Sequence, residues 1–193
     1  YASGLWPETV IKQQLEIDQL NANYQGFEIL KGIESDILTN GDLDYETDIL
    51  KTFDYIVASV HSVLNMDKEK ATQRLIRAIE NPYTSILGHL SGRLLLSRKG
   101  YPLDYPKIID ACAANKVVME LNASPYRLDI DWKWINLCLE KGVWISINPD
   151  AHEMNGIYDM KYGVAVARKA GLLASQTLNA QSLEAVKKVF LKK

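Results

Sequence analysis

The stretch VWISINPDAH, residues 143–152, is an apolar run that ends in a carboxylate and an imidazole two residues apart. Its apolar side chains predict a short buried strand, which Pro149 ends. Asp150 and His152 are therefore expected just past the strand's carboxyl end, where functional residues lie in barrels of alternating strands and helices. Carboxylate oxygens and imidazole nitrogens are common ligands of divalent metals. Because an Asp and a His after one strand are ordinary loop residues, a metal site here requires partners from elsewhere in the chain.

Alternating strand and helix signals extend outward from this stretch over the whole chain. Apolar runs predict four more strands, at residues 27–33, 54–60, 85–88 and 117–121. Amphipathic spacing, proline at helix starts and glycine after helix ends predict helices at residues 5–23, 45–52, 68–80, 105–115, 131–141, 160–170 and 182–192. Such an alternation is typical of a parallel sheet with crossover helices, so the predicted fold class is α/β.

Polar residues recur at regular intervals where the predicted strands end. The spacing is 27 residues from Glu34 to His61, 28 from His61 to His89, and 28 from Asn122 to Asp150. Each interval fits one strand–helix unit, and all three histidines of the chain fall at strand ends. Because the carboxyl ends of parallel strands meet at one edge of a sheet, we expect these side chains to form one metal site. Two carboxylates and three imidazoles suit Zn, Mn or Fe better than Ca or Mg.

Length and composition indicate one domain without a membrane segment. A chain of 193 residues is long enough for a complete hydrophobic core. Its 22 basic and 24 acidic residues nearly balance, so no large basic surface indicates nucleic acid, although a local patch would suffice. Cys112 and Cys138 lie in apolar helical stretches, as expected for buried thiols in a reducing compartment. The sequence has no run of about 18 apolar residues, and we expect a cytoplasmic protein.

Three residues are weaker candidates for binding a phosphate group. Arg93 follows His89 closely and could hold a phosphate through its planar guanidinium, although a solvated loop arginine is about equally common. Asn122 is expected to line the pocket or to cap a loop, and Arg127 follows the same strand. Two further basic residues extend the positive charge of the first of these loops: Arg98 and Lys99.

Two acidic residues near the strand ends have no assigned role in the site. Glu120 lies within a predicted strand, where its side chain either points inward or forms a structural pair. Asp36 is expected in a turn after Glu34 and is interpreted as structural. The first residue, Tyr1, is not an initiator methionine, which predicts a fragment of a longer protein.

With these residues in place, the chain resembles the polymerase and histidinol phosphatase (PHP) superfamily, in particular the carboxyl-terminal PHP domain of bacterial family X DNA polymerases. The segments that carry the resemblance, between residues 32 and 172, are GIESDIL, LDY, DYIVASVHS, TQRLIRAIENP, ILGHLSGRLL, ELNASPYRLD, INPDAH and MKYGVAVARKAGL. The resemblance implies a distorted (β/α)7 barrel, similar to a TIM barrel, with up to three manganese or zinc ions. Residues 1–193 are interpreted as one PHP domain fragment with about five of the seven units. Two opening motifs of the family, His-x-His and Asp-His at strand ends, are absent from this sequence.

The resemblance also implies a role for each candidate metal ligand. Glu34 matches a glutamate that bridges two metals, and His61 and His89 match the other protein ligands of the second metal. Asp150 matches a ligand of the first metal and His152 a ligand of the third, whose partner histidines belong to the absent motifs. We therefore expect one well-liganded metal position in this chain, at Glu34, His61 and His89.

The function that the resemblance implies is metal-dependent hydrolysis of phosphate esters. The expected substrate is DNA, through 3′–5′ exonuclease and 3′-end processing in repair, with polymerase domains upstream in the same parent chain. Because the opening motifs are absent, we expect weak or no nuclease activity from residues 1–193 alone. One alternative is a stand-alone phosphatase of the histidinol phosphatase type, acting on a small phosphate ester, and another is a non-catalytic structural module of a polymerase. Exposed strand edges of an incomplete barrel also favour a dimer.

Overall fold

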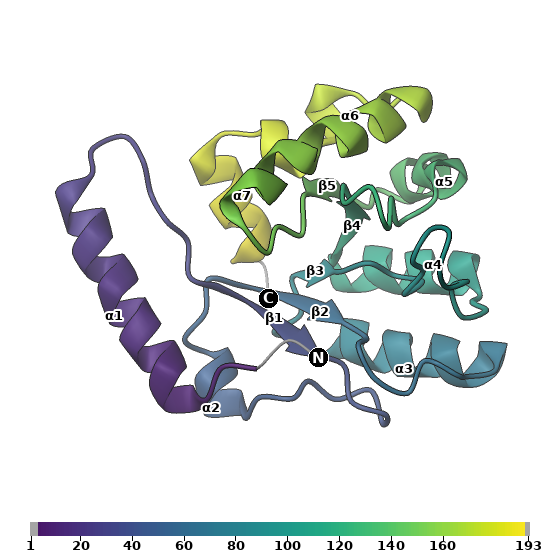
Figure 1. Ribbon diagram of the computed structural model, residues 1–193, viewed down its shortest axis with the longest axis horizontal. Coiled ribbons are helices and arrows are strands. Elements are labelled where there is room, and N and C mark those ends of the chain that lie inside the picture. Colours follow the sequence, from purple (N-terminus) through teal and green to yellow (C-terminus); the bar gives the residue numbers. More distant parts are fainter. Residues whose placement is uncertain (1–3, 192–193) are drawn as a thin grey trace.

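The structure is a computed structural model that describes residues 4–191 (Figure 1). Its strands are β1 (Gly32–Asp36), β2 (Tyr55–Ser59), β3 (Ile86–Leu87), β4 (Val118–Asn122) and β5 (Ile145–Asn148). The α-helices are α1 (Pro7–Asn23), α2 (Thr47–Leu50), α3 (Lys68–Glu80), α4 (Tyr105–Asn115), α5 (Ile135–Glu140), α6 (Met160–Lys169) and α7 (Leu183–Phe190). Short 3-10 helices are η1 (Trp132–Trp134), η2 (Met154–Asp159), η3 (Ala174–Gln176) and η4 (Leu178–Ala180).

The five strands form one parallel sheet in the order β1-β2-β3-β4-β5. Each strand therefore pairs with the strand that precedes or follows it in sequence. This order arises when successive crossovers run in the same direction around the sheet, as they do in a barrel of strand–helix units. The predicted α/β class and the five predicted strands are confirmed.

The first strand lies further along the chain than its apolar residues predict. Instead of residues 27–33, β1 begins at Gly32, because its partner strand β2 begins at Tyr55, which pairs with Gly32. Glu34 therefore lies in the middle of β1 and not past its end. The last helix was predicted to reach residue 192, which lies outside the described residues.

Helices α3, α4, α5 and α6 cover one face of the sheet and form the main hydrophobic core with it (Figure 1). Side chains alternate between the two faces of a strand, so every second strand residue points into this layer. The strand residues of the core include Ile56, Ala58, Met119, Leu121, Ile145 and Ile147. Helix α6 approaches β4 and β5 so closely that a Cβ at Gly163 would lie 2.6 Å from side-chain atoms of Ala123 and Ile147.

The opposite face of the sheet has an apolar half and a polar half. Near the amino ends of the strands it is covered by α7, whose Phe190 stacks on Tyr55 with ring centroids 5.1 Å apart. Toward the carboxyl ends, the same face carries Glu34, Glu120 and Asn148. The alternation of side chains along each strand thus separates the polar residues from the main core.

Helix α1 lies beside the β1 end of the sheet and outside the layer of α3 to α6 (Figure 1). Val10 is its buried residue, and Gln14 donates a hydrogen bond of 2.8 Å to Oγ1 of Thr52. An ion pair of 2.6 Å joins Asp18 of this helix to Lys31. Within residues 4–191, α1 and the other helices are too short or too polar to span a lipid bilayer.

Candidate metal centre

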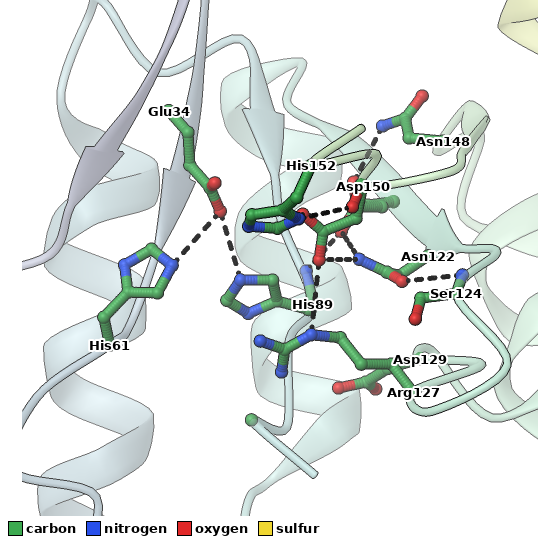
Figure 2. A network of polar contacts seen from close by, with 12 residues as sticks. Glu34, His61, His89, Asn122, Ser124, Arg127, Asp129, Asn148, Asp150 and His152 are labelled. Carbon is green, nitrogen blue, oxygen red and sulfur yellow. Dashed lines mark hydrogen bonds and ion pairs between the residues drawn. The ribbon is translucent and has the colours of Figure 1, made fainter. Parts of the chain in front are cut away.

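Glu34 on β1 faces two imidazoles that come from the loops after the next two strands (Figure 2). Its Oε1 lies 3.3 Å from Nε2 of His61 and 3.1 Å from Nε2 of His89. One ligand atom from each residue lies within 4.8 Å of the other two, so the group can hold a metal ion. One carboxylate oxygen and two imidazole nitrogens fit a transition metal better than Ca or Mg, which prefer oxygen ligands throughout.

His61 is held by a second carboxylate, Asp36, at the end of β1. Oδ1 of Asp36 accepts the backbone N–H of His61 at 3.0 Å and lies 3.5 Å from Nδ1 of the ring. Hydrogen bonds to Asp36 and Glu34 raise the pKa of His61 to about 9. Burial alone would raise the pKa of Glu34, but the hydrogen bonds from His61 and His89 hold it well below its ordinary value. Without a metal, the group is therefore an imidazolium between two carboxylates.

His89 is the most enclosed member of the group, with 2% of its surface exposed. Its backbone N–H donates to Oε2 of Glu120 at 2.5 Å. Two residues later, Ser91 donates through its backbone N–H and its hydroxyl to Oδ2 of Asp129, both at 2.8 Å. Burial raises the pKa of both carboxyl groups, Glu120 and Asp129. These two buried side chains fix the turn that carries His89.

Glu120 also connects this turn to the far side of the site. Its Oε1 accepts a hydrogen bond of 2.8 Å from Nδ2 of Asn148, and its Oε2 accepts one of 3.3 Å from Nδ2 of Asn122. Nδ2 of Asn122 also donates to Oδ2 of Asp150 at 3.0 Å, while its Oδ1 accepts the backbone N–H of Ser124. Asn122, predicted either to line the pocket or to cap a loop, therefore orients Asp150 and caps the loop as well.

Asp150 is also paired with Arg127, whose Nε lies 3.3 Å from Oδ2 of Asp150. Its φ of 53° is in the left-handed region, which Asp tolerates better than most residues. Nδ1 of His152 lies 2.9 Å from the backbone oxygen of Asp150, and the His152 side chain is 78% exposed. Within the described part of the chain, these two residues do not join a cluster of three metal-ligating side chains.

The guanidinium of Arg93 is engaged with the loop after β4. Nε donates to the carbonyl of Arg127 at 2.8 Å, Nη2 donates to the carbonyl of Leu128, and Nη1 lies 3.2 Å from Oδ2 of Asp131. These contacts favour a role in holding that loop. The phosphate contact expected for Arg93 stays a prediction.

A cavity of about 540 Å³ joins the two sides of the site. The polar residues along it include Glu34, His89, Glu120, Asn148 and Asp150, while apolar side chains of the strands and of α7 line the rest. The fold thus brings Glu34, His61 and His89 together, with Asp150 on the same cavity.

Comparisons with known proteins identify the family. No family model matches the chain. Over 192 residues it is 41% identical to the DNA polymerase/3′-5′ exonuclease PolX of Bacillus subtilis. The match covers 100% of this chain and 34% of that protein. The fold matches a histidinol phosphate phosphatase of Lactococcus lactis with a TM-score of 0.60 and 17% identity, over 85% of this chain and 75% of that one. The chain belongs to the PHP superfamily.

Other relatives of this PHP chain are named probable phosphatases. One from Thermoanaerobacter sp. strain X514 is 32% identical over 165 residues, covering 80% of this chain and 65% of the relative. One from Caldanaerobacter subterraneus is 35% identical over 139 residues, covering 66% of this chain and 52% of the relative. The chain thus spans about a third of PolX and less than two thirds of these phosphatases. The predicted superfamily is confirmed.

Several positioning residues of this PHP chain share a second sequence signal, beside the spacing of about 28 residues. They occur as polar pairs two residues apart at the carboxyl ends of apolar strands: Glu34 and Asp36, Glu120 and Asn122, Ser146 and Asn148. Because side chains alternate along a strand, both members of each pair point to the same face. Period-two polar pairs therefore mark the face of the sheet that carries the site.

Proposed function

We propose that this chain is a metal-dependent phosphoesterase that acts on the 3′ ends of DNA within a polymerase of the PolX type. The observation that carries the proposal is the group formed by Glu34, His61 and His89. It faces a cavity that also holds Asp150, in a chain 41% identical over its full length to a DNA polymerase/3′-5′ exonuclease.

Glu34, His61 and His89 would hold the best-liganded metal ion. A bound divalent metal offsets the charge of a phosphate ester and lowers the pKa of water. Zinc is favoured by the two imidazoles, and by the histidinol phosphate phosphatase, whose structure was solved with zinc, L-histidinol and phosphate. Manganese remains the alternative, and comparing affinity and activity with each ion decides between them. Asp150 and His152 would contribute to further metal positions.

The cationic side chain best disposed to meet a phosphate is Arg127. Its Nε pairs with Asp150 and its Nη1 lies 3.5 Å from the carbonyl of Arg93, while Nη2 makes no hydrogen bond to any residue the structure describes. Nη2 can therefore donate to a phosphate oxygen without losing an existing contact. Asn122 would support this phosphate contact by orienting Asp150, the partner of Arg127. Arg93 would support it by holding the loop after β4, which carries Arg127.

In the parent protein, residues 1–193 would form part of one PHP domain joined to polymerase domains. The coverage of 34% of PolX is consistent with this arrangement. Repair of DNA ends would be a cytoplasmic activity in a bacterium. A dimer through the open edge of β1 also remains a proposal, and sedimentation velocity over a range of concentrations tests it.

The test of the proposed function is hydrolysis of bis(p-nitrophenyl) phosphate and of a 5′-labelled oligonucleotide, with Mn or Zn added. Loss of activity in the variant Glu34→Gln, with activity kept in Glu80→Gln on the exposed end of α3, is the expected result. Glu80→Gln is the matched control because it makes the same chemical change outside the site. Absence of metal-dependent hydrolysis in the parent protein would contradict the proposal.

A second candidate function is hydrolysis of a small phosphomonoester. The relatives named probable phosphatases and the fold of a histidinol phosphate phosphatase favour it. The two functions differ in the ratio of rates on p-nitrophenyl phosphate and on the oligonucleotide. A chain that binds metal but hydrolyses neither substrate, in a parent protein that is equally inactive, would be a structural module.

A further inference from the structure

The loop after β3 forms a hairpin with an exposed apolar tip. Leu94 and Arg98 pair across it, and the backbone N–H of Leu94 donates to the carbonyl of Arg98 at 2.9 Å. At the tip, Leu96 is fully exposed and has a φ of 63°. A β-turn tip in this conformation favours Gly or Asn, and an exposed leucine gains no burial energy. Neither feature stabilises the fold of the protein alone. A leucine at this tip is therefore better explained by contact with a ligand.

The hairpin is attached directly to the candidate site. The backbone N–H of Leu95 donates to the carbonyl of Tyr126 at 2.6 Å, so the two loops lie side by side. The next residue, Arg127, pairs with Asp150 on the cavity at 3.3 Å. Tyr126 itself is 71% exposed. An exposed phenol ring and an exposed leucine therefore border the proposed phosphoesterase site.

The same two loops carry a local positive charge in a chain with a net charge of −2. Segments 92–101 and 122–128 contain four basic residues and no acidic residue: Arg93, Arg98, Lys99 and Arg127. Arg93 and Arg127 have acidic partners, whereas Arg98 and Lys99 form no ion pair with any residue in 4–191. The Arg98 guanidinium donates to the carbonyl of Gly92, and a hollow of about 480 Å³ runs along the hairpin.

We propose that Leu96, Arg98, Lys99 and Tyr126 bind unpaired nucleotides of single-stranded DNA next to the scissile phosphate. This inference rests on the proposed phosphoesterase function and names what its substrate contacts outside the metal centre. Tyr126 would stack on a base, Leu96 would cover a second base face, and Arg98 and Lys99 would contact the backbone. Aromatic side chains interleaved with basic residues are the usual means of binding single strands without sequence preference.

The hairpin contacts the loop after β4 through Leu95 and Tyr126, whereas Asp150 contacts that loop through Arg127. A small phosphomonoester held at the metal centre should therefore not need the hairpin. The hairpin surface therefore separates a nucleic-acid substrate from a small one. A protein partner docked on Leu96 is a different explanation, and the binding experiment below excludes or supports it.

The first experiment measures binding of fluorescein-labelled dT12 to the full 193-residue chain by anisotropy, with EDTA present so that no hydrolysis occurs. Tyr126→Ala should weaken binding by about fivefold or more, and Leu96→Gly by about threefold, since stacking on a base contributes more than aliphatic contact. Leu96→Gly should not lower the melting temperature, because glycine adopts a positive φ without strain. Lys99→Ala should flatten the dependence of log Kd on log salt by about 0.7.

Matched controls come from α1, which lies at the β1 end of the sheet. Leu15→Ala removes another exposed leucine and Lys12→Ala another exposed lysine, and both should leave the Kd for dT12 unchanged within twofold. Unchanged binding in Tyr126→Ala and Leu96→Gly, or equal weakening in the α1 controls, would overturn the inference. If the hairpin instead contacts a protein partner, Tyr126→Ala and Leu96→Gly should bind dT12 like the unmodified chain.

The second experiment separates this inference from the proposed function. In the parent protein with manganese, Tyr126→Ala and Leu96→Gly should raise KM for the oligonucleotide and leave kcat/KM for bis(p-nitrophenyl) phosphate within twofold. If the unmodified protein hydrolyses neither substrate while these variants still weaken dT12 binding, the phosphoesterase proposal fails and the DNA-binding surface stands. Equal losses on both substrates would show that the hairpin only supports the site, and would overturn the inference.

Discussion

Asp36 accepts the backbone N–H of His61 at 3.0 Å, and the same Oδ1 lies 3.5 Å from Nδ1 of that ring. The carboxylate therefore fixes both the loop and the ring whose Nε2 faces Glu34. A carboxylate behind a metal-binding imidazole sets its orientation and raises its basicity, and losing it typically lowers metal affinity by roughly 10- to 100-fold. We expect a loss of that size for Zn in Asp36→Asn, measured by competition with a chromophoric chelator. Asp48→Asn on the exposed surface of α2 is the control and should bind Zn like the unmodified chain.

The number of tight metal sites is a second prediction. Glu34, His61 and His89 form a cluster of three ligands, whereas Asp150 and His152 do not belong to one within residues 4–191. Calorimetric titration of the chain with Zn should therefore give one tight equivalent. Replacing His61 by Ala should abolish this equivalent, and replacing His152 by Ala should leave it intact. Two or three tight equivalents in the unmodified chain would contradict the prediction.

Much of the arrangement could be predicted from the sequence because the fold repeats one simple unit. The spacing of about 28 residues indicates which strand ends meet, and it relates His61 to His89 without any knowledge of side-chain contacts. The predicted start of β1 was wrong. Residues 27–31 have the apolar residues of a strand, but they do not pair with a neighbouring strand in the sheet. Strand pairing is a tertiary property, which local composition does not encode.

The positioning contacts were harder to predict because they depend on register between strands. Glu120 reaches Asn148 on the next strand since Glu120 pairs with Ser146, two residues earlier. Such a neighbour is fixed only when the register of β4 and β5 is known. The hydrogen bonds of Arg93 to the carbonyls of Arg127 and Leu128 likewise depend on how the loop after β4 folds.

Metal binding should release a proton near neutral pH. The pKa of His61 is raised to about 9, because it donates hydrogen bonds to Asp36 and Glu34, so its ring is protonated at pH 7.5. A metal needs the neutral imidazole, and Zn affinity should therefore rise with pH up to about 9. Calorimetry at pH 7.5 in buffers of different ionisation enthalpy should give about one proton released per Zn. An enthalpy independent of the buffer would show that the ring is already neutral.

The same pKa shift predicts how the metal-free chain responds to pH. The folded pKa of His61 lies above its unfolded value of about 6.5, so protonation of His61 stabilises the fold. This stabilisation is fully present below about pH 6.5. This contribution is lost as the pH rises through about 9. Urea unfolding in EDTA should thus show a midpoint that falls between pH 7 and pH 9. The variant Asp36→Asn should show a smaller fall, because His61 loses one of its two acceptors.

Glu120 provides the last prediction, because one buried side chain joins the two sides of the site. It is 4% exposed and accepts hydrogen bonds from the backbone of His89 and from Asn148 and Asn122. Glu120→Gln keeps the size of the side chain but replaces one carboxylate oxygen by an NH2 group. This NH2 group faces one of these donors, and that donor then has no acceptor. A buried donor without a partner costs about 1–3 kcal/mol, so the free energy of unfolding should fall by that amount.

The measurement is urea unfolding of Glu120→Gln beside Glu80→Gln, whose exposed carboxylate should change stability by less than about 0.5 kcal/mol. Zn affinity should also fall in Glu120→Gln, because the turn that carries His89 loses an acceptor. A decrease in stability with unchanged Zn affinity would mean that Glu120 supports the sheet without positioning His89. Loss of both would show that Glu120 positions His89 for the metal as well as stabilising the fold.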